Sequence, residues 1–420
     1  MRHLLKNSAI ISLGIICVAL GNYAFHPIIA HYLTMEAFGE LQSILALLYI
    51  IGIPAATLGL LTKKNTSYLY SRNELAKIRS IRNWLNLLFL KIGIIGMIVI
   101  TLLTPILSAF LNLSDKTPLF FLGFLFLFSL LTTINTGILD GMQRFHWTSF
   151  NNFLATGTKI IAAIILLSIG FGVVGAMIAI CMAYLMPYCL TFIQSHDLDK
   201  SKPIGQKTKK LFLKHSLTTF LNLLSITMLY SWDIILIKHL MPSDIAGQYT
   251  ALSIFGKVIL FATGPIHQAL FPMAAGLKAQ WKKQNLLVLQ SLLLVFLAGS
   301  AITAAFYYFP NFIVNTLMGE NFLPISAYLG MIAVIFTILS LSNTLIQFFI
   351  STENTKAYYF LFISLALMSI GLYLFHGSLN EVLKIIMAVQ IFTFLSLLSY
   401  LGIITQKNLH ERSFSSISGI

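Results

Sequence analysis

About twelve apolar stretches, each long enough to cross a lipid bilayer, follow one another along this chain of 420 residues. A helix of about 20 residues spans the hydrocarbon core of a membrane, which is roughly 30 Å thick. Charged residues make up only 10% of the chain and hydrophobic residues 57%, whereas soluble proteins carry about 25% charged residues. The sequence therefore predicts an all-α integral membrane protein with about twelve transmembrane helices. The expected spans are residues 8–30, 41–62, 85–110, 118–138, 149–169, 171–193, 216–240, 248–272, 286–308, 327–350, 357–376 and 380–404.

Lysines and arginines gather in those polar segments that share one side of the membrane if the N-terminus lies in the cytoplasm. Basic residues of membrane proteins concentrate in cytoplasmic loops, so this pattern predicts that both termini are cytoplasmic. The net charge of +14 is then explained without nucleic-acid binding, for which no soluble domain is available. Of the 27 basic residues, 21 lie on the predicted cytoplasmic side, three on the other side (Lys116, Lys238 and Lys384) and three inside spans (Lys91, Lys159 and Lys257).

Motifs for chemistry are missing from the sequence. It contains no phosphate-binding glycine loop ending in Lys-Ser/Thr, no His-Glu-x-x-His zinc motif and no Gly-x-Ser-x-Gly element. The three cysteines, Cys17, Cys181 and Cys189, all lie in apolar runs and form no metal-binding spacing. We therefore expect no cofactor, no ATP hydrolysis and no enzymatic activity.

The two halves of the chain resemble each other. Leu5-Lys6-Asn7-Ser8 precedes the first span, and Leu213-Lys214-His215-Ser216 precedes the seventh, 208 residues later. After the same two spans, Glu36 and Gly39 match Asp244 and Gly247 at the same offset. Six helices per half place the copies in the same orientation, which is typical of two-lobed transporters. We expect pseudosymmetric six-helix lobes at residues 1–200 and 215–420, a cytoplasmic basic linker at residues 201–214 and a central cavity.

Several spans carry polar residues spaced three or four apart, which places each set on one helix face. Serine and threonine stripes often hold membrane helices together, but stripes in four spans, two of them with a lysine, favour a water-filled cavity. The candidate substrate-binding residues from these stripes are Asn152, Thr156, Lys159, Lys257, Gln268 and Gln347.

The buried lysines are the sharpest signal for a binding site. Lys159 lies in the middle of its span, where a lysine costs about 3 kcal/mol on insertion scales unless it faces water or a partner. Lys257 is nearly as deep. Lys91, a further cavity candidate, lies close enough to the cytoplasmic surface to reach the headgroups instead. We expect Lys238, near the end of its span, to extend outward to water.

Two other ionisable residues are candidates for ion coupling. Asp233 lies inside a span and could pair with a buried lysine, carry a proton or sodium ion, or sit in outer water. His267 lies between Pro265 and Pro272, where we expect the helix to break or kink. A lone histidine could equally be a packing residue.

Three loop segments are similar to those of the polysaccharide and O-antigen flippases of the multidrug/oligosaccharidyl-lipid/polysaccharide exporter superfamily. They are the turn Tyr32-Leu33-Thr34-Met35-Glu36-Ala37-Phe38-Gly39, the turn Gly137-Ile138-Leu139-Asp140-Gly141-Met142-Gln143-Arg144-Phe145, and Ala246-Gly247-Gln248-Tyr249. The resemblance implies a protein of the bacterial cytoplasmic membrane that moves undecaprenyl-diphosphate-linked oligosaccharides from the inner to the outer leaflet by alternating access. Lipopolysaccharide assembly is the setting it implies, with membrane lipids and polysaccharide polymerase machinery as partners.

Two alternatives remain open from the sequence. An ion-coupled multidrug or metabolite exporter of the same architecture would be expected to have an acid-lined, aromatic cavity, which the buried lysines oppose. A membrane-embedded glycan polymerase would be expected to have larger outer loops than this chain has.

Overall fold

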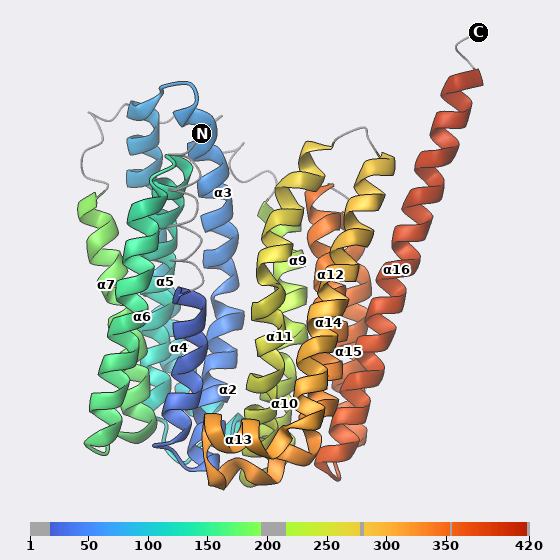
Figure 1. Ribbon diagram of the computed structural model, residues 1–420. Coiled ribbons are helices and arrows are strands. Elements are labelled where there is room, and N and C mark those ends of the chain that lie inside the picture. The colour runs from blue at the N-terminus through green and yellow to red at the C-terminus, as the bar shows by residue number, and fades with distance from the viewer. Residues whose placement is uncertain (1–16, 195–215, 278–280, 353–354, 418–420) are drawn as a thin grey trace. The chain divides into compact units, whose positions relative to one another are not determined.

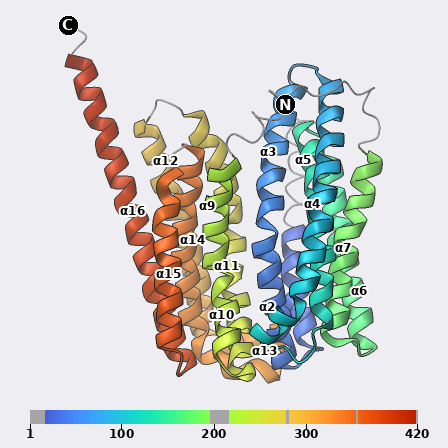
Figure 2. The same ribbon diagram turned by 180° about the vertical axis from the view of Figure 1, so that it is seen from behind.

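The computed structural model describes residues 17–194, 216–277, 281–352 and 355–417, and within these ranges the regular structure is entirely helical. The chain divides into two compact units, Met1–Phe220 and Leu221–Ile420. Each unit is a bundle of long helices (Figures 1 and 2). The predicted linker at residues 201–214 lies outside the described residues, and the exact lobe boundaries stay a prediction.

Unit 1 begins, in its described part, with the helix Cys17–Ala30 and continues through six further helices. The second expected span is in fact a pair of helices that meet at Gly52 with a bend of 42°. The helices after Ala30 are α2 (Met35–Ile51), α3 (Ile53–Tyr70), α4 (Leu75–Phe110), α5 (Thr117–Gly141), α6 (Phe145–Ser168) and α7 (Gly172–Gln194).

Unit 2 begins within the first helix of a second bent pair, α9 (Ser216–Leu229) and α10 (Trp232–Leu240), which meet at an angle of 45°. The short α13 lies at one end of this bundle, and α16 extends well beyond the other helices of the unit (Figures 1 and 2). The remaining elements are α11 (Ser243–Gly276), α12 (Trp281–Tyr308), α13 (Pro310–Met318), η1 (Glu320–Tyr328), α14 (Leu329–Ser351), η2 (Thr355–Ala357), α15 (Tyr358–Leu374) and α16 (Leu379–Ile417).

The all-helical membrane fold expected from the sequence is confirmed. Among the described residues, eight helices are long and apolar enough to cross a membrane, or ten if each bent pair is one span. Two shorter apolar helices, Cys17–Ala30 and Tyr358–Leu374, occupy the positions of two further expected spans. The count of about twelve crossings stays a prediction. Of the break or kink expected near Pro265, the break is not present, because α11 continues without interruption to Gly276, and a kink stays a prediction. The loss of a backbone hydrogen bond to a proline is tolerated in membrane helices.

Close helix packing in unit 1 depends on glycines. A Cβ atom at Gly137 on α5 would lie 2.8 Å from the carbonyl oxygen of Gly59 on α3, and one at Gly141 would lie 2.8 Å from the carbonyl oxygen of Lys63. Small residues at such contacts let two membrane helices approach closely. On α4, by contrast, large apolar side chains such as Leu102 and Ile106 are exposed, which is typical of a surface that faces lipid.

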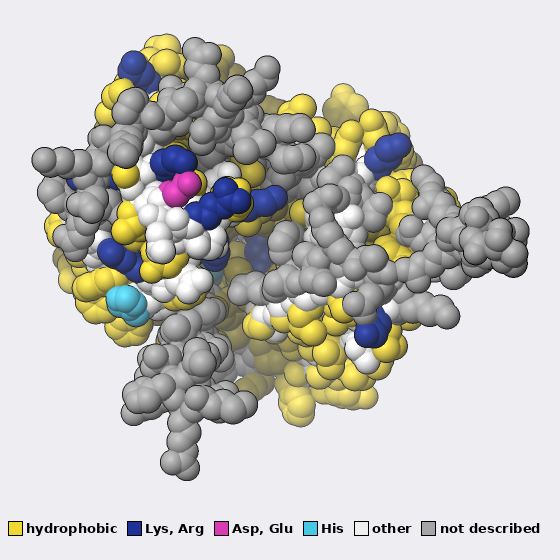
Figure 3. Space-filling model, turned by 90° about the horizontal axis from the view of Figure 1, so that it is seen from above, with side chains coloured by type: hydrophobic (Ala, Val, Ile, Leu, Met, Phe, Trp, Pro, Cys, Tyr) yellow, Lys and Arg dark blue, Asp and Glu magenta, His cyan; other side chains and the backbone are white. Residues whose placement is uncertain are grey.

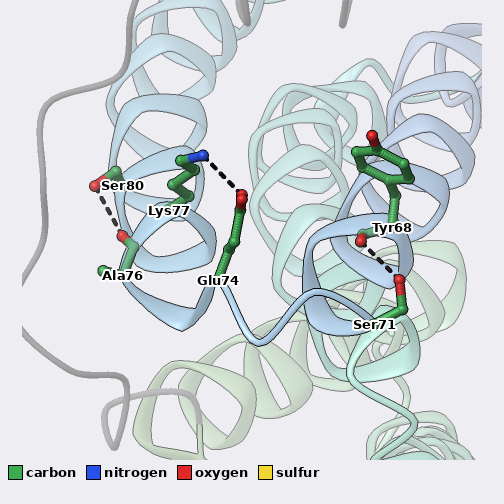
Figure 4. Close-up of polar contacts among 6 residues, drawn as sticks. All are labelled: Tyr68, Ser71, Glu74, Ala76, Lys77 and Ser80. Carbon is green, nitrogen blue, oxygen red and sulfur yellow. Dashed lines mark hydrogen bonds and ion pairs between the residues drawn. The ribbon is translucent and has the colours of Figure 1, made fainter.

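The end of unit 1 at which α3 meets α4 is rich in positive charge. Asn73 takes a left-handed conformation (φ 57°) in the turn, and Lys77 pairs with Glu74 at 2.8 Å (Figure 4). The Ser71 hydroxyl donates to the Tyr68 carbonyl oxygen at 2.9 Å in the same turn (Figure 4). Seen from this end, the described surface shows Lys and Arg side chains with little acidic surface beside them (Figure 3). The positive-inside rule predicts that this end faces the cytoplasm, and the orientation stays a prediction.

Lys238 departs from the sequence-based expectation. It was expected to extend outward to water, but its side chain is only 1% exposed and its Nζ donates to the Ser243 hydroxyl at 3.2 Å. The chain turns back from α10 into α11 at this point, and the partner Ser243 is the first residue of α11. The expectation was wrong because the fold of the turn could not be seen in the apolar pattern.

Candidate functional site

The Lys159 ammonium on α6 is held by two uncharged partners. Its Nζ donates to the Asn22 side-chain oxygen at 2.6 Å and lies 4.5 Å from the centre of the Phe25 ring. An aromatic face attracts a cation through its quadrupole without neutralising it. The arrangement therefore fixes the position of the ammonium group and leaves its positive charge unbalanced.

Helix packing brings these partners together. Helix Cys17–Ala30 lies directly against α6, since a Cβ atom at Gly21 would be only 2.6 Å from the Thr156 side chain. Asn22 and Phe25 are three residues apart and share one face of the first helix. On α6, the Thr156 hydroxyl is buried and donates to the carbonyl oxygen of Asn152 at 2.9 Å, while the Asn152 side chain is exposed.

The described acids of unit 1 lie near helix ends or in turns, whereas Lys159 lies within the length of α6. The ones described are Glu36, Glu40, Glu74, Asp115 and Asp140, and each lies at or near the end of a helix or in a turn. Lys159 is fourteen residues after the start of α6 and nine before its end, which is about 21 Å and 14 Å of helix. No described acid of this unit is placed to neutralise it. We name Lys159, Asn22 and Phe25 the Lys159 cradle.

A second polar pair lies beside the cradle. The buried His26, next to Phe25, is hydrogen-bonded through Nδ1 to the Gln42 side-chain nitrogen on α2 at 3.0 Å. The sequence pattern did not predict a role for Asn22, Phe25, His26 or Gln42. Asn22 and His26 are four residues apart in an otherwise apolar run. This spacing is the signal that could have identified a polar face on the first helix.

The buried lysine of unit 2 has an acidic residue in its surroundings. Lys257 is 5% exposed and is attracted electrostatically to Asp233, which is 2% exposed. Asp233 also accepts hydrogen bonds from the Tyr249 hydroxyl and from the backbone N–H of Ile234. Of the roles that the sequence left open for Asp233, burial argues against outer water, and its attraction to Lys257 favours pairing. Lys257 has an acid in its surroundings, whereas the Lys159 cradle has none among the described residues of its unit.

His267 joins α11 to α14. Its Nε2 is 3.0 Å from the Thr344 hydroxyl and its Nδ1 is 3.3 Å from the Asn343 side-chain nitrogen. One turn earlier the hydroxyls of Thr263 and Ser340 are 2.6 Å apart. These contacts form a polar seam between α11 and α14.

The other candidates are more dispersed. Gln347 is half-buried on α14, one turn beyond Asn343, and the side chain of Gln268 lies outside the described part of the structure. Lys91 is exposed among exposed apolar residues of α4, a placement that favours contact with lipid headgroups over a cavity. Lys159 and Lys257 belong to different units, so a cavity shared by them stays a prediction.

The fold is similar to that of several solved membrane transporters. A multidrug resistance MATE family transporter of the MOP superfamily, solved in an inward-facing conformation, matches with a TM-score of 0.80 and 14% identity, over 94% of this chain and 96% of that chain. The lipid II flippase MurJ in an inward closed conformation matches with a TM-score of 0.71 and 16% identity, over 98% and 93% of the two chains. The MATE multidrug transporter DinF-BH, solved as a complex, matches with a TM-score of 0.71 and 16% identity, over 96% and 95%.

The family follows from the sequence match. Residues 4–278 match the model of the family described as polysaccharide biosynthesis protein, and the chain belongs to that family. No curated protein matches the chain in sequence. The family resemblance inferred from the loop segments is thereby confirmed.

Proposed function

We propose that this protein is a flippase that carries a lipid-linked, anionic oligosaccharide from the inner to the outer leaflet of a bacterial cytoplasmic membrane. The Lys159 cradle binds the negative charge of the substrate, which is either the diphosphate of the lipid linkage or an acid group on a sugar. Alternating access then exposes this charge first to the cytoplasmic and later to the outer side.

The unbalanced charge of Lys159 is the observation that carries the proposal. A cation at this depth is costly unless water or an anion compensates it. Its two partners are neutral, so a substrate phosphate or carboxylate can complete the site with a charge-assisted hydrogen bond. The exposed amide of Asn152, two turns along α6, supplies a hydrogen-bonding group suited to sugar hydroxyls.

The same observation weighs against an exporter of organic cations. Such a substrate would be repelled by an unpaired ammonium and would need a carboxylate in the membrane interior. In unit 1, the described acids are at helix ends and turns. Membership in a family of polysaccharide biosynthesis proteins supports a glycan substrate over a drug.

Replacement of Lys159 tests the proposal in cells that depend on this protein for surface glycan. We expect Lys159→Ala to abolish surface glycan at normal protein levels, because the anion loses its charged partner, and Lys159→Arg to retain part of it. The matched control is Lys91→Ala, which removes a lysine from the exposed face of α4 and should leave export unchanged. Normal glycan in the Lys159→Ala strain would show that the cradle does not bind the substrate.

A further inference from the structure

The hydrogen bonds around His267 define where its protons lie. A neutral imidazole has one N–H donor and one acceptor nitrogen. The Asn343 side-chain nitrogen can only donate, so it donates to Nδ1 at 3.3 Å. The Nε2–H group is then the donor to the Thr344 hydroxyl at 3.0 Å, whose own proton goes to the Ser340 carbonyl oxygen at 2.9 Å. The seam thus holds a neutral histidine with a proton on Nε2.

Asn343 has an unused acceptor at the same place. Its side-chain oxygen is buried and has no hydrogen-bond partner among the described residues, which is uncommon for a buried polar atom. If a proton binds to Nδ1 of His267, that nitrogen becomes a donor and can no longer accept from the amide. Rotation of the Asn343 amide by half a turn exchanges its nitrogen and oxygen and offers the unused oxygen to the new N–H group. Before proton uptake the amide oxygen of Asn343 has no partner; after uptake and rotation the amide nitrogen has none. The number of unpaired amide atoms therefore does not increase.

The surroundings of His267 hold little charge. α11 packs against α10, α12, α14 and η1, and α14 has no titratable residue in its whole length. The charged and titratable residues of the other elements lie toward their ends, and on α11 itself Lys257 is ten residues away, about 15 Å. These residues are Asp233, Lys238 and His239 on α10, Asp244, Tyr249 and Lys257 on α11, Lys282, Lys283, Tyr307 and Tyr308 on α12, and Glu320 and Tyr328 on η1.

From this geometry we propose that His267 and Asn343 form a proton-binding site, and that the proton bound there is the ion coupled to transport. This inference rests on the proposed function for its role in transport, although the site itself does not depend on it. His267 takes one proton on Nδ1 from water on one side of the membrane and releases it on the other side. No described acid lies beside the ring, so the charged form is favoured by an arrangement in which water reaches the seam between α11 and α14.

Solid-state ¹⁵N NMR of the full-length protein in lipid vesicles, with ¹⁵N-labelled histidine, tests the site directly. The spectrum distinguishes neutral imidazole from imidazolium, and the difference between wild type and His267→Gln identifies the His267 signal. We expect a neutral ring with the proton on Nε2 at pH 8 that converts to imidazolium as the pH falls. His146→Gln, at the exposed start of α6, is the control and should leave the His267 signal in place.

Two substitutions of Asn343 should shift this titration in opposite directions. Asn343→Asp places a carboxylate beside Nδ1, so His267 should remain charged up to a pH at least one unit higher than in wild type. Asn343→Leu removes the acceptor, so conversion should need a pH lower by about one unit. A His267 signal that stays neutral between pH 8 and pH 5 in wild type and in Asn343→Asp would overturn the proposal, as would identical titrations in all three proteins.

The role in transport has its own readout. In cells, His267→Gln should reduce surface glycan at normal protein levels, and dissipation of the pH gradient with nigericin should reduce it in wild type. If His267 titrates as expected but export ignores both treatments, the coupling role is wrong. If the titration holds while cells lacking the protein export glycan normally, the proton site stands and the proposed flippase function fails.

Discussion

A carboxylate placed inside the Lys159 cradle should prevent the cradle from binding an anion, although the lysine itself is retained. Asn22→Asp is nearly isosteric and puts an oxygen at the position that now lies 2.6 Å from Nζ. Two unit charges at about 2.8 Å attract each other by roughly 6 kcal/mol at an effective dielectric constant of 20, before desolvation is subtracted. The ammonium would then be paired internally and no longer open to an anion.

The loss can be expressed as an affinity. A hydrogen bond to a charged group contributes about 1.5–3 kcal/mol, so substrate binding should weaken by roughly 10- to 150-fold. Surface glycan, measured by lectin binding and normalised to protein in the membrane, should fall close to the level of Lys159→Ala. Asn22→Ser is the neutral control: it shortens the partner but keeps the Phe25 contact, and should retain most of the activity. Export by Asn22→Asp equal to wild type at equal protein levels would refute the reasoning.

Three further predictions concern stability and topology. Lys257→Ala should leave the buried Asp233 without a cation in its surroundings and destabilise the purified protein by about 0.5–3 kcal/mol. The double variant with Asp233→Asn should recover part of this loss in thermal unfolding, and strict additivity would show that the two residues do not interact. Gly137→Ala should lower the melting temperature, at a cost of about 1–3 kcal/mol, because its Cβ would meet the α3 backbone. A Cβ at Gly157 would have no neighbour within 4 Å, so Gly157→Ala should leave the melting temperature unchanged. Equal effects of the two substitutions would contradict the proposed close packing. Reporter fusions in the α3–α4 turn should read cytoplasmic and those in the α12–α13 turn outside; the reverse would overturn the predicted orientation.

The transmembrane helices could be predicted because lipid imposes a strong and local requirement on the sequence. Each expected span coincides with a helix or a bent pair, from the helix that ends at Ala30 to α16. The bends at Gly52 and at Ser231 were not visible, since residues 41–62 and 216–240 are apolar on both sides of each bend. Hydropathy records whether a segment can enter the membrane and not the direction in which its axis runs.

The candidate site could be predicted only in part, and the reason is similar. The depth of Lys159 follows from its position in one span, but its partner Asn22 is 137 residues earlier in the chain. Which helices lie side by side is decided by contacts such as Gly21 against Thr156, which no local pattern encodes. For the same reason the sequence treated Lys159 and Lys257 as equivalent, whereas among the described residues of the two units only Lys257 has an acid in its surroundings.

Translocation by the purified protein in lipid vesicles tests the central claim most directly. The vesicles would carry a polyprenyl-diphosphate-linked sugar in the inner leaflet, and its arrival at the outer leaflet would be followed with an added glycan-cleaving enzyme. Wild-type protein should expose the lipid-linked sugar, and Lys159→Ala should not, while an analogue with a neutral linker and neutral sugars should remain inside in both cases. Equal translocation by wild type and Lys159→Ala, or equal translocation of the charged and neutral substrates, would contradict the account.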